Sequence, residues 1–344
     1  MGGPHARTPR NPARPRVFAT RWLPGPALER LAERSELRVW PEPRPPGPAE
    51  LADAAREAEG LLCLLCDRVD AALFEACPRL RVVSSVSVGV DHIDLEEATR
   101  RGIPVGHTPG VLTETTAELA FALLLAASRR VAEGDRLVRA GRWTPDRAWD
   151  PELLLGRDLL GATLGVLGAG AIGAAVARRA AAFGMRVAVW SRTRRELPGV
   201  PEPLWGSLEE TLRRSEFLSI HLPLVPETRG LLDAARLGML PRGAILVNTA
   251  RGPIVDEAAL VRALESGHIA AAGLDVFGTE PLPLESPLVR LENVVLTPHI
   301  GSASLATRAR MAELAVENLL AGLERRPLPH CANTVSNSRP NTIP

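Results

Sequence analysis

Three segments in the second half of the sequence carry residues that could act on a small organic acid. Arg251 lies in LVNTARGPIVDE, Asp275 and Glu280 lie in AGLDVFGTEPLP, and His299 lies in NVVLTPHIGSAS. Each segment opens with an apolar run that is typical of a buried strand, so these side chains follow strand ends. Because ligands of open α/β sheets bind at the carboxyl ends of strands, an Arg, a carboxylate and a His there suit a substrate that carries its own carboxylate.

Taken one at a time, these residues also have purely structural explanations. Arg251 could form a salt bridge at a strand end, and His299 could be a buried imidazole whose hydrogen bonds are satisfied. His92 and His107 are expected to be structural. The case for chemistry therefore depends on the rest of the sequence.

A glycine-rich turn precedes the three segments in LGVLGAGAIGAAVARR, residues 164–179. A G-x-G-x-x-G spacing alone is weak evidence, but here a buried apolar run precedes it and an alanine-rich helical pattern follows it. Gly168 permits a tight turn, Gly170 lets a pyrophosphate approach the backbone, and Gly173 lets the helix pack against the sheet. Since a helix N-terminus favours a phosphate, the sequence predicts a dinucleotide site rather than a plain tight turn.

The residues after the next strand select the nucleotide. NAD-binding proteins place an Asp or Glu about 20 residues downstream, where it holds the ribose 2′-hydroxyl. Here the strand ends in WSRTRR, and no carboxylate occurs before Glu196. Arg192 could bind a 2′-phosphate through charge-assisted hydrogen bonds, with Ser191 and Thr193 as further donors. The sequence thus predicts NADP(H) in preference to NAD(H), although a solvated basic turn would show the same pattern.

Short apolar runs alternate with helical patterns along most of the chain, and this alternation predicts βαβ units and parallel sheets. The predicted strands cover residues 17–20, 37–40, 60–65, 81–85 and 103–106 in a first series, then 164–167, 186–190, 217–221, 244–248, 271–275 and 293–297 in a second. A long helix is predicted between the two series, over about 113–139, and a last helix ends near Leu323.

The order of these elements predicts an α/β fold with two doubly wound parallel-sheet domains. The second domain is inserted into the first, because the last helix comes after the second sheet is complete. The first domain is expected to cover 17–108 and 300–330, and a Rossmann dinucleotide-binding domain to cover 109–299. Residues 1–16 and 331–344 are expected to be disordered tails.

The composition excludes several classes of function. The 344 residues carry a formal net charge of +1 and contain no Lys, Tyr or Gln. Schiff-base lysines, P-loop lysines and reductases with a Tyr/Lys pair are therefore excluded. A near-neutral chain with 3% aromatic residues also gives no indication of a nucleic-acid partner.

Neither a metal site nor a membrane segment is expected. Cys63 and Cys66 form a C-x-x-C pair, but residues three apart on a strand point to opposite faces, so they can neither share a metal nor bridge easily. Few cysteines without a disulfide framework suit a reducing cytoplasm. The apolar run 119–127 is too short to span a bilayer.

These motifs together resemble the D-isomer-specific 2-hydroxyacid dehydrogenases, and most closely their glyoxylate/hydroxypyruvate reductase branch. The resemblance covers about residues 17–330 and rests on VSVGVDHIDLEEATRRGIPV, TPGVLTETTAELAFALLLA, GAGAIG, WSRTRR, NTARGPIVDE, AGLDVFGTEPLP and LTPHIGSAS. It implies that the Rossmann domain is inserted into a flavodoxin-like substrate domain. It also implies a homodimer formed through the region of the predicted helix 113–139 and the loop after it.

The resemblance further implies catalytic roles. His299 would protonate the keto oxygen of the substrate, and Glu280 would orient the His299 imidazole. Arg251 would bind the substrate carboxylate and polarise the carbonyl. Backbone N–H groups of the loop Ser87, Val88 and Gly89 would bind the same carboxylate.

Other positions match residues that surround substrate or cofactor in the family. Leu65 is the candidate wall of the substrate pocket, and Trp149 matches a Trp that can reach a neighbouring subunit's substrate cleft or that simply packs. Asp275 matches a contact to the nicotinamide carboxamide. The full cofactor set is Thr115, Gly168, Ala169, Gly170, Ala171, Ile172, Gly173, Ser191, Arg192, Thr193, His221, Leu222, Pro223, Thr228, Thr249, Ala250, Asp275 and Gly301.

The expected reaction is therefore the NADPH-dependent reduction of glyoxylate and hydroxypyruvate to glycolate and D-glycerate. Reduction of 2-ketogluconate, or another D-2-hydroxyacid dehydrogenase activity, remains an alternative. A non-catalytic NAD(P)H sensor similar to the family's corepressors also remains open, because those proteins keep the same three catalytic residues. A formate-dehydrogenase-like function is disfavoured, because Glu280 stands where those enzymes have Gln.

Overall fold

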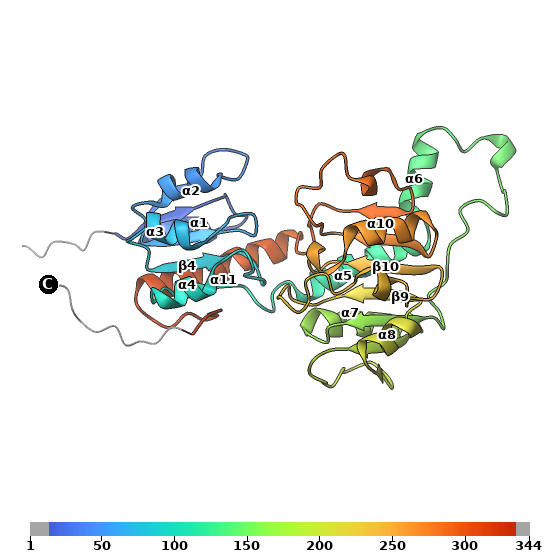
Figure 1. Ribbon diagram of the computed structural model, residues 1–344. Helices are drawn as coiled ribbons and strands as arrows, with labels where there is room; N and C mark the ends of the chain where they lie inside the picture. Colours follow the sequence, from blue (N-terminus) through green and yellow to red (C-terminus); the bar gives the residue numbers. More distant parts are fainter. Residues whose placement is uncertain (1–13, 335–344) are drawn as a thin grey trace, which may run out of the picture. The chain divides into compact units, whose positions relative to one another are not determined.

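The computed structural model describes residues 14–334, which divide into two compact units. One unit comprises the chain up to Val111 together with the part from Leu305 onward, and the other runs from Leu112 to Ser304. Each contains a parallel β-sheet with helices on both faces (Figure 1). The predicted α/β fold with two doubly wound parallel sheets is thus confirmed.

The first unit is built on a five-stranded sheet in the order β2-β1-β3-β4-β5. Its strands are β1 (Arg16–Ala19), β2 (Glu36–Val39), β3 (Gly60–Cys63), β4 (Val82–Ser85) and β5 (Val105–Gly106). Every residue of β3 and β4 is buried, which explains why these strands read as continuous runs rather than as an alternating pattern. The strand order is the flavodoxin-like one.

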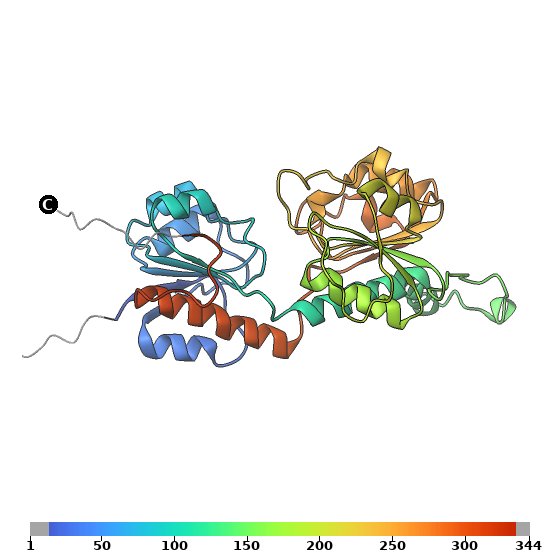
Figure 2. The same cartoon turned by 90° about the horizontal axis from the view of Figure 1, so that it is seen from below.

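Helices cover both faces of this sheet. They are α1 (Ala27–Arg34), α2 (Pro48–Ala55), α3 (Ala71–Ala76), α4 (Leu95–Arg100) and α11 (Leu305–Leu323). One face packs through Phe18, Leu61 and Val83 into a core shared with α2, α3 and α4. Helix α11 lies along the opposite face, against β3, β4 and α1 (Figure 2).

The second unit contains a seven-stranded sheet in the order β12-β11-β10-β9-β6-β7-β8. Its strands are β6 (Thr163–Leu167), β7 (Arg186–Trp190), β8 (Leu204–Trp205), β9 (Phe217–Ile220), β10 (Ala244–Asn248), β11 (Ile269–Leu274) and β12 (Val294–Leu296). The chain moves outward from β6 to β8 and then restarts at β9 on the other side of β6. This reversal is the crevice at which Rossmann-type sheets bind nucleotides.

The helices of the second unit are α5 (Thr113–Ser128), α6 (Val131–Arg139), α7 (Ala171–Ala182), α8 (Leu208–Arg214), α9 (Ala234–Leu237) and α10 (Glu257–Glu265). Short 3₁₀ turns are η1 (Pro145–Arg147), η2 (Gly252–Ile254) and η3 (Pro287–Arg290). Helices α5 and α7 pack on one face of the sheet, and α8, α9 and α10 pack on the other (Figure 2).

The prediction of a single long helix over 113–139 is wrong, because the structure has two helices there. Helix α5 ends at Ser128, whose carbonyl accepts the N–H of Arg157 at 2.9 Å instead of continuing the helix. Arg130 then adopts a left-handed conformation with φ of 53°. Its guanidinium bonds to Glu133 in the first turn of α6 at 2.8 and 2.6 Å. A contact from a residue much further along the chain therefore ends the helix.

The predicted tails differ from the structure at their inner ends. Arg16 is the first residue of β1 rather than part of a tail. Cys331 forms a β-bridge with Gly106, and the Asn333 side chain accepts the Val105 N–H at 2.9 Å. The expectation for residues 1–13 and 335–344 lies outside the described residues.

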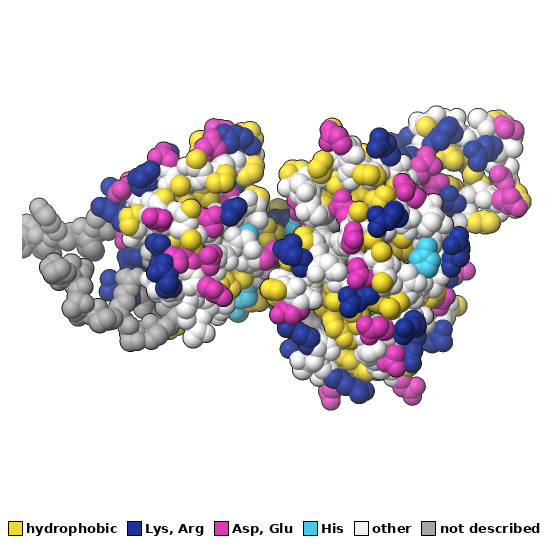
Figure 3. All heavy atoms as spheres, in the orientation of Figure 1, with side chains coloured by type: hydrophobic (Ala, Val, Ile, Leu, Met, Phe, Trp, Pro, Cys, Tyr) yellow, Lys and Arg dark blue, Asp and Glu magenta, His cyan; other side chains and the backbone are white. Residues whose placement is uncertain are grey.

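Two further features concern the charges on the surface and the character of the helices. Basic and acidic side chains are interspersed over the face shown in Figure 3. None of the helices within residues 14–334 combines the length and the hydropathy that a membrane-spanning helix needs.

Candidate active site

The register of three neighbouring strands brings the candidate residues of the second unit to one edge of the sheet. Asn248 at the end of β10 pairs with Leu274 of β11, and Leu274 pairs with Leu296 of β12. The segments that carry Arg251, Asp275 and His299 therefore leave the sheet at the same level. Residues far apart along the chain become spatial neighbours in this way.

Glu280 and His299 form a direct pair. Glu280 Oε2 lies 2.7 Å from His299 Nδ1, and Glu280 Oε1 accepts the Phe277 N–H at 3.0 Å. About a third of each side chain is exposed, 35% for Glu280 and 29% for His299. Since Nδ1 is engaged by the carboxylate, Nε2 is the ring nitrogen that remains for another partner.

The charge state of Glu280 follows from its surroundings. Partial burial raises the pKa of this carboxyl, but the hydrogen bonds from His299 and the Phe277 N–H, with the charges of His299 and Arg251, lower the pKa below its ordinary value overall. The carboxylate is therefore ionised at neutral pH. Because the charge of Arg251 helps to lower the pKa of Glu280, the Arg251 guanidinium lies within electrostatic reach of this carboxylate.

Asp275 holds the backbone of the segment that carries His299. Its buried carboxylate accepts bonds from the Thr297 hydroxyl at 2.7 Å and from the N–H groups of Ile300 and Gly301, both at 2.8 Å. Burial raises the pKa of Asp275 against the opposing effect of these bonds. His299 itself has φ of 53°, a left-handed conformation that is costly for a residue other than glycine. The Asp275 network is what maintains that conformation.

Arg251 is positioned by a residue that the sequence reasoning missed. The Asn248 side chain accepts the Ala250 N–H at 3.0 Å and donates to the Arg251 carbonyl at 2.9 Å, which closes the turn after β10. An Asn at a strand end directly before the TARG segment was the available signal. A Cβ at Gly252 would lie 1.9 Å from the Phe277 carbonyl carbon and oxygen. Only glycine therefore allows this turn to approach the Phe277–Glu280 loop so closely.

The glycine turn after β6 has the shape of a dinucleotide cradle. A Cβ at Gly168 would lie 2.6 Å from the His221 carbonyl oxygen, and one at Gly173 would lie 1.9 Å from the Gly168 carbonyl oxygen. By contrast, a Cβ at Gly170 would meet no atom within 4 Å, so open space lies before the N-terminus of α7. The glycine turn and the N-terminus of α7 therefore fit a bound pyrophosphate. Ala169, Ala171 and Ile172 complete the turn.

The predicted adenosine end lies beside this turn. Trp190, the last residue of β7, pairs with Leu167 of β6, so Ser191, Arg192 and Thr193 follow β7 next to the glycine turn. Arg192 and Thr193 are exposed, and Ser191 is half-buried. A 2′-phosphate could therefore reach all three without displacing packed side chains.

Other candidate cofactor residues follow β9 and β10. The half-buried His221 follows β9, its Nε2 lies 2.8 Å from Ser219 Oγ, and burial lowers its pKa to about 3, which keeps the ring neutral. Thr228 bonds back to the Pro223 carbonyl at 2.6 Å and so shapes the loop that contains Leu222.

Two threonines and two small residues complete the set. The Thr249 hydroxyl is buried and has no hydrogen-bond partner among the described residues, which suits a group that a bound ligand would satisfy. Ala250 follows it in the turn, Thr115 is half-buried in the first turn of α5, and Gly301 contacts Asp275.

Leu65, Ser87, Val88 and Gly89 belong to the first unit. Cys63 of β3 pairs with Ser85 of β4, so Leu65 and Ser87 both lie two residues beyond paired strand ends. Leu65, Val88 and Gly89 are half-buried, whereas Ser87 is 1% exposed. They form one cluster at the carboxyl edge of the five-stranded sheet.

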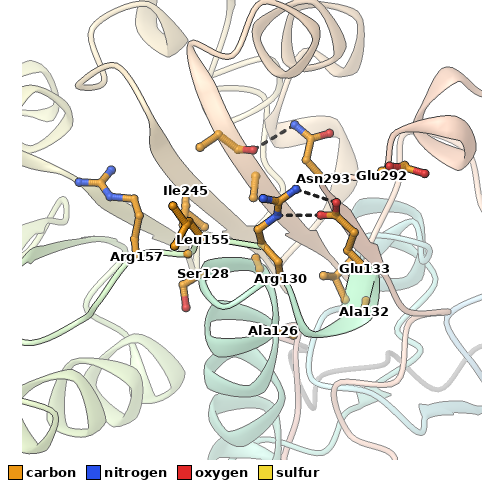
Figure 4. Close-up of a pocket in the computed structure, with 15 residues that line it drawn as sticks. Ala126, Ser128, Arg130, Ala132, Glu133, Leu155, Arg157, Ile245, Glu292 and Asn293 are labelled. Carbon is orange, nitrogen blue, oxygen red and sulfur yellow. Dashed lines mark hydrogen bonds and ion pairs between the residues drawn. The ribbon is translucent and has the colours of Figure 1, made fainter. Parts of the chain in front are cut away.

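Trp149 is not brought together with the other candidates of its own unit. It lies beyond η1 and is 96% exposed, so packing inside the chain does not account for it. In the same segment, Leu155 lines a pocket together with Asn293 and residues of α5 and α6 (Figure 4). The pocket also includes Ile245 and Ala270, near the amino ends of β10 and β11, so it lies at the opposite edge of the sheet from Arg251.

Residues 121–301 match the NAD binding domain of the D-isomer specific 2-hydroxyacid dehydrogenases. A curated relative from Aeropyrum pernix, named glyoxylate reductase, is 51% identical over 322 residues, which span 93% of this chain and 96% of the relative.

Two solved structures are similar over nearly their whole length. A protein from Thermus thermophilus is 54% identical with a TM-score of 0.86, over 92% of this chain and 99% of that one. The NADPH-dependent glyoxylate/hydroxypyruvate reductase of Sinorhizobium meliloti, solved with NADP and malonate, is 36% identical with a TM-score of 0.82, over 93% of this chain and 97% of that one.

Proposed function

The chain belongs to the D-isomer specific 2-hydroxyacid dehydrogenase family, and from this premise we propose that it reduces glyoxylate and hydroxypyruvate to glycolate and D-glycerate with NADPH. Relatives named glyoxylate reductase support the first substrate, and the Sinorhizobium meliloti enzyme supports the second substrate and the cofactor. The observation that carries the proposal is the 2.7 Å contact between His299 Nδ1 and Glu280 Oε2, in a site that Arg251 influences electrostatically.

His299 acts as the general acid in this proposal. Its Nδ1 is held by Glu280, so the proton given to the keto oxygen comes from Nε2. The ionised carboxylate stabilises the charged imidazolium and keeps the ring in one orientation. A bound reduced nicotinamide supplies the hydride to the keto carbon.

Arg251 binds the substrate carboxylate and polarises the neighbouring carbonyl. A guanidinium presents two parallel N–H donors to a carboxylate, which fixes the plane of a 2-keto acid as well as its position. Ser87, Val88 and Gly89 present backbone N–H groups to the same carboxylate, and Leu65 limits the space available to the substrate's side chain. The first unit, predicted over 17–108 and 300–330, thus forms the substrate domain, and the second unit, predicted over 109–299, forms the NADP-binding domain.

The glycine turn and the N-terminus of α7 would hold the pyrophosphate of a bound cofactor. The residues that would line the cofactor are Thr115, His221, Leu222, Pro223, Thr228, Thr249, Ala250 and Gly301. Asp275 would contact the nicotinamide carboxamide: it already accepts three hydrogen bonds, and a carboxylate has about four acceptor sites, so one remains for an amide N–H.

NADPH is preferred to NADH because Ser191, Arg192 and Thr193 stand where NAD-binding proteins have a carboxylate. An acidic side chain there would repel the 2′-phosphate, whereas Arg192 attracts it. The NADP complex of the Sinorhizobium meliloti relative supports this assignment.

The protein forms a homodimer through the segment that follows α6. That segment exposes apolar side chains that a single chain leaves in water, with Trp149 at 96%, Leu155 at 66% and Trp143 at 56%. A second copy would cover them, and Trp149 would then reach the partner's substrate site or pack against the partner.

A panel of 2-keto acids assayed with NADPH and with NADH tests the proposed function. Turnover of glyoxylate and hydroxypyruvate with a lower KM for NADPH is expected. Faster turnover of 2-ketogluconate would move the protein to another branch of the family. No oxidation of either cofactor with any keto acid would overturn the enzymatic function and favour a cofactor sensor.

A further inference from the structure

The turn that follows β4 has three consecutive carbonyls tied back to the protein. The Ser87 carbonyl accepts the Thr108 N–H at 2.7 Å, and the Val88 carbonyl accepts His107 Nδ1–H at 3.0 Å. The Gly89 carbonyl accepts the Ser87 hydroxyl at 2.7 Å. Each carbonyl of the turn therefore has its own donor, and two of these donors are side chains.

This arrangement fixes the N–H groups of the turn. Across a trans peptide bond the N–H points away from the preceding carbonyl, so the N–H groups of Val88, Gly89 and Val90 point away from the three donors. Within residues 14–334, none of these three N–H groups donates to a protein acceptor. Successive free N–H groups of this kind form a concave site for an anion.

The Ser87 hydroxyl is the end of a longer chain of hydrogen bonds whose direction can be deduced. A carbonyl can only accept, so the Ser87 proton is committed to Gly89. The 2.6 Å contact between Ser85 Oγ and Ser87 Oγ then requires Ser85 to donate. Ser85 has one proton, so its 3.1 Å contact with His92 requires Nε2–H of His92 as the donor. Protons thus point from His92 through Ser85 and Ser87 to Gly89.

The two serines of this chain of hydrogen bonds are buried. Ser85 is 0% and Ser87 1% exposed, so water cannot replace a lost partner. The neighbouring Cys63 thiol remains neutral, because burial raises its pKa well above its usual range. In this dry environment around the two serines, the hydrogen bonds of the chain strengthen one another.

We propose that His92 is a positioning residue for the substrate: through Ser85 and Ser87 it orients the turn whose N–H groups hold the substrate carboxylate. The proposal rests on the proposed function. The sequence predicted only a structural role for His92. His107 anchors the adjacent Val88 carbonyl directly, and the Thr108 N–H holds the Ser87 carbonyl, so the turn is held at three successive carbonyls.

Two substitutions of His92 separate positioning from bulk packing. His92→Leu removes the donor, whereas His92→Gln keeps an N–H at about the distance of Nε2. For His92→Leu we expect KM for glyoxylate to rise about ten- to hundredfold, the usual effect of stranding a buried partner, while KM for NADPH stays the same. His92→Gln should restore most of the lost affinity. Ser85→Ala should raise the same KM, and the double variant should be no worse than the single ones.

His268→Leu is the matched control. Its imidazole also bonds to a carbonyl, with Nε2 3.2 Å from the Leu237 oxygen, but in the other unit. It should leave KM for glyoxylate unchanged. An unchanged KM in His92→Leu, or an equal rise in the KM values for glyoxylate and NADPH, would overturn the proposal.

A long-range ¹H–¹⁵N NMR spectrum of the full-length wild-type protein tests the chain without turnover. His92 should carry a proton on Nε2, and a proton on Nδ1 alone would overturn the deduced direction even if every variant failed to fold. A wild-type protein that is inactive with all keto acids would overturn the proposed function and, with it, the substrate role of His92. The tautomer would then decide only whether the chain of bonds exists.

Discussion

Glu280 performs two tasks with its two oxygens. One oxygen accepts the Phe277 N–H and anchors the carboxylate to its own loop, and the other engages His299. The resemblance to the family implied that Glu280 would contact His299. It could not predict the Phe277 anchor, which depends on how the loop after β11 folds back on itself.

Glu280→Gln should change how stability depends on pH. Because interactions in the folded state lower the pKa of Glu280, the pair contributes stability that is complete above the ordinary carboxyl value of about 4.3 and is lost as the pH falls through the lower folded-state value. The Tm difference between wild type and Glu280→Gln should therefore be largest near neutral pH and shrink below about pH 4. Thermal melts from neutral pH to below about pH 4 measure this difference in Tm. A difference that grows on acidification would contradict the pairing of an ionised Glu280 with His299.

Arg192→Ala tests the choice of nucleotide. Loss of a charge-assisted hydrogen bond to the 2′-phosphate should raise KM for NADPH by about tenfold or more and leave KM for NADH nearly unchanged. Arg195→Ala, just beyond the proposed donors, is the matched control. Equal effects of Arg192→Ala on both cofactors would show that Arg192 does not read the phosphate.

At the scale of elements, the predicted strands and helices largely agree with the structure because buried parallel strands and amphipathic helices have strong local patterns. Strand β8 was missed, since two residues show no periodicity. The break between α5 and α6 was missed because the cause is a distant N–H, that of Arg157. Asn248 was missed because its two bonds depend on a turn whose geometry no pattern reports.

Gly252→Ala tests whether the close approach of two loops shapes the site. A methyl group placed 1.9 Å from the Phe277 carbonyl must push the loops apart, and such overpacking typically costs about 1–3 kcal/mol. We expect a lower Tm and a fall in kcat/KM for glyoxylate. Gly134→Ala in α6, where the added Cβ would have an ordinary contact at 3.4 Å, should leave kcat/KM unchanged and should not lower the Tm, because Ala favours a helix over Gly. A Gly252→Ala variant with full activity would contradict the account of this turn.

At the scale of the whole molecule, two α/β units built from one interrupted chain follow from the order of the elements along the sequence. The last helix, α11, returns to the first sheet, where it packs against β3 and β4. The order of elements does not predict how a second chain would cover the segment after α6.

Sedimentation velocity tests the proposed dimer. The wild type should sediment as a dimer, and Leu155→Arg should shift it toward monomer because a charge would be buried in the interface. Leu305→Arg, at a leucine that is 81% exposed in the other unit, should not change the oligomeric state. A monomeric wild type would contradict the proposal.

In the proposed mechanism, His299 gives a proton to the keto oxygen while Glu280 holds its ring. Single-turnover reduction of glyoxylate by wild type and His299→Ala, with saturating NADPH, tests this proton transfer. The rate of the chemical step should fall by about two to four powers of ten in the variant, while NADPH binding is retained. A His299→Ala variant that reduces glyoxylate at the wild-type rate would contradict it.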